Sequence, residues 1–165
     1  MSKTEGFLKE AFAGESQANR KYLAFAAKAD QEGFPQVARL FRAAAEAETV
    51  HAHSHLRALN RIRGTKENLL EAIAGETHEF KKMYPEMIEA AKAEGQKGAE
   101  RSFSYANSVE KVHAQLYQTL LDGLGKPQEN YFYYVCPVCG FTAEKHAPEN
   151  CPVCGTKGAM FKRIQ

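Results

Sequence analysis

The sequence predicts a mainly α protein, a four-helix bundle followed by a small domain built around four cysteines. Two observations carry this prediction. Apolar residues recur every three or four positions from residue 4 to residue 125, which is typical of amphipathic helices. All four cysteines lie between residues 136 and 154, which indicates one local site. We therefore expect the bundle at residues 1–126, a linker at 127–133 and the small domain at 134–165.

Glycine and proline residues divide the helical region into four helices of roughly 25 to 30 residues. The breaks fall at residues 32–35, 63–65 and 94–98. After the fourth helix, the polar residues 128–130 lead into the aromatic run 131–135, which predicts a strand.

The two halves of the helical region repeat each other. Residues 11–16 recur as residues 72–77, and the later matches lie 62 positions apart, so the offset changes once from 61 to 62. Several such matches in the same order indicate duplication of a helical hairpin. The later matched pairs include Tyr22 with Tyr84, Phe41 with Phe103, Glu48 with Glu110, and His51 with His113.

Composition excludes some classes of protein. The chain is 44% hydrophobic and 25% charged, with a net charge of +2 and no apolar run near the roughly 20 residues that span a membrane. The N-terminus has no apolar stretch of signal-peptide length, so we expect a cytoplasmic protein. Lys and Arg are scattered among Glu without a basic stripe, which argues against nucleic-acid binding.

Each predicted helix places one glutamate in its inward apolar stripe: Glu15, Glu48, Glu76 and Glu110. An isolated buried carboxylate costs several kcal/mol, and the stripes offer no nearby Lys or Arg. A pair of metal cations would supply the missing positive charge.

Two histidines and a further glutamate extend this set. His51 and His113 each follow a stripe glutamate by three positions, which puts both ligands on one helical face. Glu79 lies one turn after Glu76, where the first half has no acid, and it could give one metal an extra oxygen ligand. A single Glu-x-x-His pair more often lies on a solvated helix surface. The prediction of metal binding therefore rests on the whole set of glutamates and histidines. We leave out His53, His78 and His146, which lack comparable partners, and His55, which lies one turn from His51 where it would cap the bundle core.

Tyr22 and Tyr84 lie on or beside the inward stripes, two turns after an inward glutamate. A phenol there needs a hydrogen-bond partner, so both tyrosines are candidates to support a ligand carboxylate.

The cysteines form two matching C-P-V-C-G loops that could hold one tetrahedral ion: Cys136, Cys139, Cys151 and Cys154. The glycine after each loop allows a tight turn that aims backbone N–H groups at sulfur. A structural zinc ribbon uses the same four ligands, so spacing alone does not choose the metal. The aromatic residues Tyr134, Phe141 and Phe161, together with a neighbouring two-metal site that needs electrons, favour iron.

These motifs together resemble the rubrerythrin family, a ferritin-like di-iron domain followed by a rubredoxin-like domain, over nearly the whole chain. Ferritin-like di-iron bundles use one Glu from each of two helices and Glu-x-x-His from the other two. The resemblance implies two non-haem irons in an oxo- and carboxylate-bridged site, with Glu48 and Glu110 bridging, and one iron on the four cysteines. It also implies that one iron exchanges Glu79 for His51 between oxidised and reduced states.

The activity that the resemblance implies is a peroxidase that reduces hydrogen peroxide to water in oxidative stress defence. Electrons would return through the cysteine-bound iron from rubredoxin or from an NAD(P)H-dependent flavoprotein. The rival functions are ferroxidase or iron storage, which would not need the cysteine domain, and a simple electron carrier or zinc-stapled interaction protein.

The break between the second and third helices, about three residues, predicts a domain-swapped homodimer. In a ferritin-like bundle these helices run parallel, so the connection must cross about one helix length. Several residues at roughly 3.5 Å each cannot do so. Each two-metal site would then combine hairpins of two chains.

Overall fold

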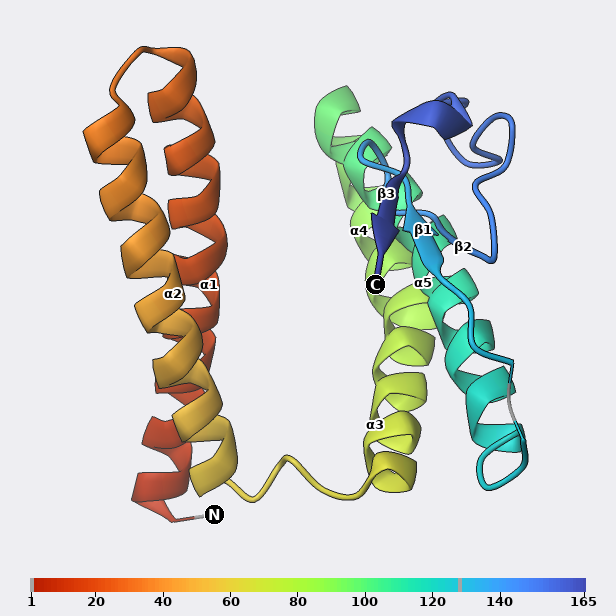
Figure 1. Cartoon of the computed structure of the whole chain (residues 1–165), viewed down its shortest axis with the longest axis horizontal. Coiled ribbons are helices and arrows are strands. Elements are labelled where there is room, and N and C mark those ends of the chain that lie inside the picture. Colours follow the sequence, from red (N-terminus) through yellow and green to blue (C-terminus); the bar gives the residue numbers. More distant parts are fainter. Residues whose placement is uncertain (1, 128) are drawn as a thin grey trace. The chain divides into compact units, whose positions relative to one another are not determined.

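A computed structural model describes residues 2–127 and 129–165, so Gln128 of the predicted linker lies outside the described residues. The chain is mainly helical with a small C-terminal strand domain that bears the four cysteines, which confirms the predicted fold class. It forms two compact units that divide between Arg63 and Gly64 (Figure 1). Within the described residues, no helix is both long enough and apolar enough to cross a membrane.

The first unit is a hairpin of two antiparallel helices, α1 (Lys3–Gln31) and α2 (Pro35–Ala58). The Ser2 hydroxyl caps α1 by accepting a hydrogen bond from the backbone N–H of Glu5 at 3.1 Å. Gly33 follows α1 with a φ of +82°, a conformation that glycine adopts without a steric penalty, and the chain then turns into α2. The break predicted at residues 32–35 is therefore confirmed.

Small side chains form the buried centre of this hairpin. Ala26, Ala29 and Ala38 cluster together with at most 6% of their surface exposed, and Phe41 packs against them. Alanine at the contact lets the two helix backbones approach closely.

The connection after α2 is longer than the three residues predicted. Helix α2 ends at Ala58, and Asn60 adopts a φ of +53°, so residues 59–64 form a six-residue connection before the next helix. The Asn60 N–H bonds to the Arg57 carbonyl at 2.9 Å and the Arg61 N–H to the Leu56 carbonyl at 3.1 Å. Asparagine tolerates the left-handed conformation that ends a helix, so Asn60 stops α2 before Gly64 is reached.

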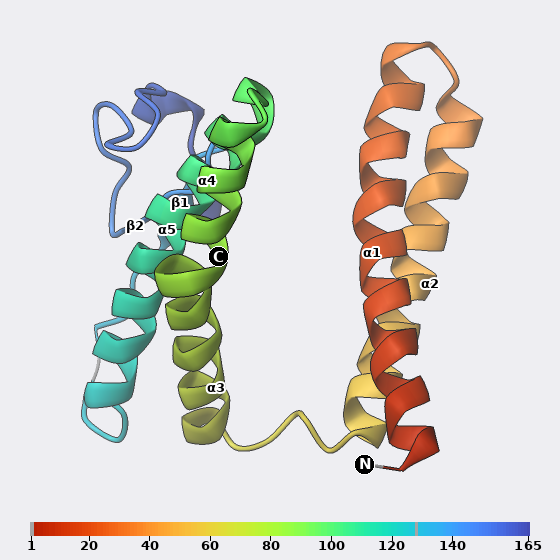
Figure 2. The same cartoon turned by 180° about the vertical axis from the view of Figure 1, so that it is seen from behind.

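The third helix runs through three consecutive segments of the second unit, α3 (Thr65–His78), the π-helical η1 (Glu79–Met83) and α4 (Tyr84–Ala93) (Figure 2). A π-turn holds one residue more than an α-turn. It lies between Glu76 and Tyr84, where the repeat offset grows from 61 to 62. The extra residue of the second half is thus accommodated as a π-turn.

Helix α5 (Lys97–Asp122) pairs with this third helix. The duplication is visible in the packing of rings. Tyr22 and Phe41 lie 6.1 Å apart between centroids in the first hairpin, and their counterparts Tyr84 and Phe103 lie 6.3 Å apart in the second. The repeated sequence pattern therefore corresponds to a repeated hairpin structure.

The small domain has a three-stranded antiparallel sheet of order β2-β1-β3, made of β1 (Tyr133–Val135), β2 (Thr142–Glu144) and β3 (Lys162–Ile164). A 3-10 turn, η2 (Gly158–Met160), precedes β3. Strand β1 falls within the predicted aromatic run and begins at Tyr133, the last residue assigned to the linker. Strand β2 contacts α5, which brings the cysteine domain beside the second hairpin.

Candidate metal centres

The first hairpin brings three predicted ligands together. Ligand atoms of Glu15, Glu48 and His51 all lie within 4.8 Å of one another. The His51 Nδ1 atom lies 2.8 Å from a carboxylate oxygen of Glu48, and 55% of the His51 side chain is exposed against 18% for Glu48. Two carboxylates and one imidazole nitrogen are together a donor set that could hold a metal ion.

The second hairpin builds the matching group from Glu76, Glu110 and His113, whose ligand atoms also lie within 4.8 Å of one another. The His113 Nδ1 atom lies 2.7 Å from a Glu110 carboxylate oxygen and 3.8 Å from one of Glu76. The other ring nitrogen, Nε2, lies 2.9 Å from the hydroxyl of Thr142. This histidine is only 28% exposed.

The paired carboxylates of the second hairpin resist ionisation. Burial, followed by the charge of Glu110 and a hydrogen bond with it, raises the pKa of Glu76 to about 7. Burial also raises the pKa of Glu110. Two carboxylates this close repel each other when both are ionised. Metal ions would supply the positive charge that offsets this repulsion.

Glu79 opens the π-turn one helical turn beyond Glu76, and it is partly buried. Its charge reaches this site, since Glu79 contributes to the raised pKa values of Glu76, Glu110 and Tyr84. Burial is the main cause of the Tyr84 shift, and its phenol lies near all three glutamates.

The two tyrosines predicted to support the ligands, Tyr22 and Tyr84, contact neighbouring aromatic rings. Tyr22 packs against Phe25 and Phe41, and Tyr84 packs against Phe103. The hydrogen bonds of the described residues include none from either phenol to a ligand carboxylate, so their supporting role stays a prediction.

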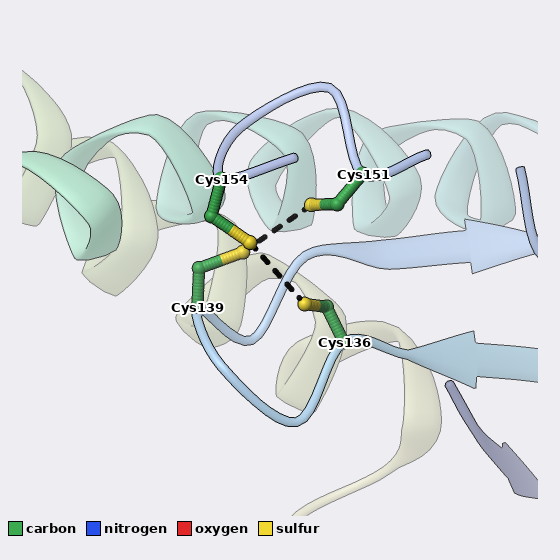
Figure 3. Close-up of side chains that lie close together, drawn as sticks. All are labelled: Cys136, Cys139, Cys151 and Cys154. Atoms are coloured by element: carbon green, nitrogen blue, oxygen red, sulfur yellow. Dashed lines mark hydrogen bonds between the residues drawn. The ribbon is translucent and has the colours of Figure 1, made fainter. Parts of the chain in front are cut away.

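The four cysteines come together from two loops, and their sulfur atoms point toward one another (Figure 3). The Sγ atoms of Cys136 and Cys154 lie 3.5 Å apart, as do those of Cys139 and Cys151. Gly140 and Gly155 have φ values of +83° and +77°, which confirms the predicted tight turns.

The two loops have the same backbone turn, but the second cysteine of each, Cys139 or Cys154, receives different hydrogen bonds at its sulfur. In each, the backbone N–H two residues beyond the second cysteine hydrogen-bonds to sulfur, from Phe141 to Cys139 and from Thr156 to Cys154. The Thr156 hydroxyl adds a second contact at 3.1 Å, and these bonds lower the pKa of Cys154 to about 6. Burial instead raises the pKa of Cys139. A readily formed thiolate is what a metal ligand requires.

Two residues near the second hairpin's site escaped the sequence prediction. Thr142 lies 29 positions after His113, and no local pattern links them. The second residue is Tyr117, whose pKa is raised by burial and by the charges of Glu76 and Glu110, so its phenol lies near these carboxylates. Its position one turn after His113 is a signal that could have identified it.

Together, the fold and these ligand groups define a class of protein, a ferritin-like carboxylate-bridged metal protein with a rubredoxin-like domain. Residues 6–121 match the family model described as rubrerythrin, and residues 134–162 match that of the rubrerythrin rubredoxin-like domain. The chain belongs to the rubrerythrin family, whose members are oxidoreductases.

Similar proteins span nearly the same length. The chain is 38% identical to Rubrerythrin-2 of Clostridium acetobutylicum, over 96% of this chain and 95% of that protein. It is 36% identical to a rubrerythrin of Porphyromonas gingivalis, over 99% and 91%. Among solved structures, the fully reduced, all-ferrous state of nigerythrin matches with a TM-score of 0.60 at 31% identity, over 99% of this chain and 88% of that one.

Proposed function

We propose that this protein is a non-haem di-iron peroxidase that reduces hydrogen peroxide to water in the cytoplasm. One observation carries the proposal: a single chain presents two matched Glu-Glu-His groups and one four-cysteine group. The first two groups suit a hard, oxygen-rich two-metal site and the third suits a thiolate-bound ion. The all-ferrous state of nigerythrin supports iron as the metal.

Seven side chains are the proposed ligands of the two-metal site. Glu15, Glu48 and His51 come from the first hairpin, and the remaining four, Glu76, Glu79, Glu110 and His113, come from the second. The partly exposed His51 and the π-turn residue Glu79 are proposed to exchange at one metal. The high exposure of His51 leaves room for such a movement.

Two ferrous ions at this site would supply both electrons needed to break the O–O bond without releasing a hydroxyl radical. The side chains of the protein would position the metal ions and provide protons. Reduction of one peroxide to two waters consumes two protons as well as two electrons. The phenols of Tyr84 and Tyr117 lie near Glu76 and Glu110 and are the proposed proton-bearing groups.

Electrons are proposed to enter through an iron on Cys136, Cys139, Cys151 and Cys154, with rubredoxin or an NAD(P)H-dependent flavoprotein as the donor. The exposed side chain of Val138, at 60%, lies between two of the cysteines, where a donor protein could approach the metal loop.

The short connection between the hairpins supports a domain-swapped homodimer. Residues 59–64 span at most about 25 Å between the ends of α2 and α3, whereas α2 itself is about 36 Å long. A parallel arrangement of the second and third helices in one bundle requires the longer distance. Each complete two-metal site is therefore proposed to combine the first hairpin of one protomer with the second hairpin of its partner.

Mixed dimers test the swap. A Glu15→Ala chain and a Glu76→Ala chain each lack one half-site, so neither alone should form a complete site. When both are produced together and the mixed dimer is purified by two tags, a swapped dimer regains one intact site. An unswapped dimer regains none. Iron bound at the carboxylate site, measured for the mixed dimer, distinguishes the two arrangements.

Anaerobic stopped-flow absorbance tests the activity. The fully reduced protein is mixed with peroxide, or separately with dioxygen, and the red ferric-thiolate colour is followed. A peroxidase reacts much faster with peroxide than with dioxygen and sustains NADH-coupled peroxide consumption with an added donor. Faster reaction with dioxygen would support ferroxidase activity instead, and a colourless, inert protein would support a zinc-stapled domain.

A further inference from the structure

The imidazole of His113 is held at both of its ring nitrogens. Nδ1 faces the carboxylates of Glu110 and Glu76, at 2.7 and 3.8 Å. Nε2 faces the Thr142 hydroxyl at 2.9 Å, and Thr142 belongs to strand β2 of the cysteine domain. The ring therefore bridges the carboxylate site and the cysteine domain within one chain.

The Thr142 hydroxyl is itself fixed by the cysteine loop. It hydrogen-bonds to the carbonyl oxygen of Gly140 at 3.2 Å, and Gly140 directly follows the metal-ligand candidate Cys139. A Cβ added to Gly140 would lie 3.9 Å from the side chain of Val109, a residue of α5 that is 2% exposed. The loop that carries Cys139 thus packs against α5 at Val109, next to Glu110 in the sequence.

Counting hydrogens sets the direction of these bonds. A carbonyl oxygen only accepts, so the single hydroxyl hydrogen of Thr142 goes to Gly140, and its oxygen accepts from Nε2–H of His113. A metal bound at Nδ1 would leave the ring hydrogen on Nε2, where it needs an acceptor.

We propose that Thr142 is a positioning residue for the metal site: its hydroxyl, oriented by Gly140, accepts from Nε2–H of His113 and holds Nδ1 toward the metal. The inference rests on the proposed metal binding and goes further by assigning a role to a residue of the cysteine domain. The second hairpin's ligand is thereby tied to the loop that carries Cys139.

The counterpart histidine lacks this support. The side chain of His51 is 55% exposed, and within residues 2–127 and 129–165 the structure gives its Nε2 atom no hydrogen-bond partner. Within its own chain, Thr142 therefore holds the ring of His113 at a second atom, a contact that the described residues do not give His51.

The test compares Thr142→Val, which keeps the shape but loses the hydroxyl, with Thr142→Ser, which keeps the hydroxyl. Thr119→Val on α5 is the matched control, because the hydrogen bond that the described residues give its hydroxyl stays within the helix, to the Gln115 carbonyl. Each full-length protein is loaded with zinc, which is diamagnetic. Zinc affinity at the carboxylate site and the ring N–H signal of His113 in nitrogen-15 spectra are then measured.

The Thr142→Val protein should bind zinc at this site roughly 10- to 100-fold more weakly and lose the slowly exchanging Nε2–H signal. Thr142→Ser and Thr119→Val should match the unaltered protein in both measurements. Unchanged affinity and an unchanged N–H signal in Thr142→Val would overturn the proposal. So would an equal loss in Thr142→Ser, because packing rather than the hydroxyl would then be responsible. If the unaltered protein binds no metal at the carboxylates, the proposed function itself fails.

Discussion

The two helical hairpins carry the same three candidate ligands at equivalent positions, yet they hold them in different surroundings. In the first hairpin, His51 contacts Glu48 and is largely exposed. In the second, burial and the charge of Glu110 raise the pKa of Glu76, and His113 is held at both ring nitrogens. The second half also contains one more residue, taken up as a π-turn that begins at Glu79. The matched candidate ligands of the two hairpins therefore have different surroundings within one chain.

The largest expected effect tests what the halves share. Glu48→Ala and Glu110→Ala should each remove the metals of the carboxylate site, because each deletes a bridging candidate from one half. Iron should fall from about three to about one per chain in both variants, and the red colour of the cysteine site should remain. Metal analysis by mass spectrometry checks this. A full iron complement in either variant would show that its glutamate is not a ligand.

The next effect tests what differs between the halves. His113→Ala should weaken metal binding at the carboxylate site by at least roughly tenfold more than His51→Ala, because His113 is held by Thr142 and His51 is exposed. Metal affinity measured by competition with a chelator gives the comparison. His53→Ala, on the same helix as His51, is the control and should leave affinity unchanged. Equal losses of metal affinity in His113→Ala and His51→Ala would show that the contact with Thr142 does not strengthen metal binding by His113.

The raised pKa of Glu76 predicts a pH dependence of stability for protein stripped of metal at this site. The pKa of Glu76 rises from an ordinary value of 4.5 to about 7 on folding, so the folded state binds more protons between these values. Stability should therefore fall as pH increases from about 4.5 to 7. Melting temperature against pH should flatten in Glu76→Gln, which cannot ionise, and a loaded site should not show the decline. A rise in stability over this pH range would contradict the raised pKa of Glu76.

The smallest effect concerns the second duplicated feature, the cysteine loops. Thr156 gives Cys154 a hydroxyl contact at 3.1 Å, whereas the equivalent position beside Cys139 is Phe141. Hydrogen bonds to sulfur stabilise the more electron-rich ferrous state. Thr156→Val should therefore lower the reduction potential of the cysteine-bound iron, and Thr156→Ser should preserve it. Spectroelectrochemical titration checks both values, and an unchanged potential in Thr156→Val would contradict the role of the hydroxyl.

Much of this arrangement was predictable from local patterns. Helical periodicity identified the four helices, and the stripe glutamates with Glu-x-x-His identified the two groups that the hairpins bring together. Such features depend on residues one or two turns apart, where helix geometry fixes the relation.

Other features depend on conformation or on distant contacts. The early stop of α2 came from Asn60, whose left-handed conformation is one of several open to asparagine. The π-turn left only a change of repeat offset as its trace. The contact between His113 and Thr142 joins two domains across 29 positions, and periodicity carries no information about it.

We propose that metal ions neutralise Glu15, Glu48, Glu76 and Glu110. Anomalous diffraction at the iron edge, on crystals grown anaerobically, is the most direct test. We expect two iron peaks among these four glutamates, with the hairpins of each site from different chains, and one peak among the cysteines. Absence of any metal peak among the carboxylates, with these side chains turned to solvent, would contradict it.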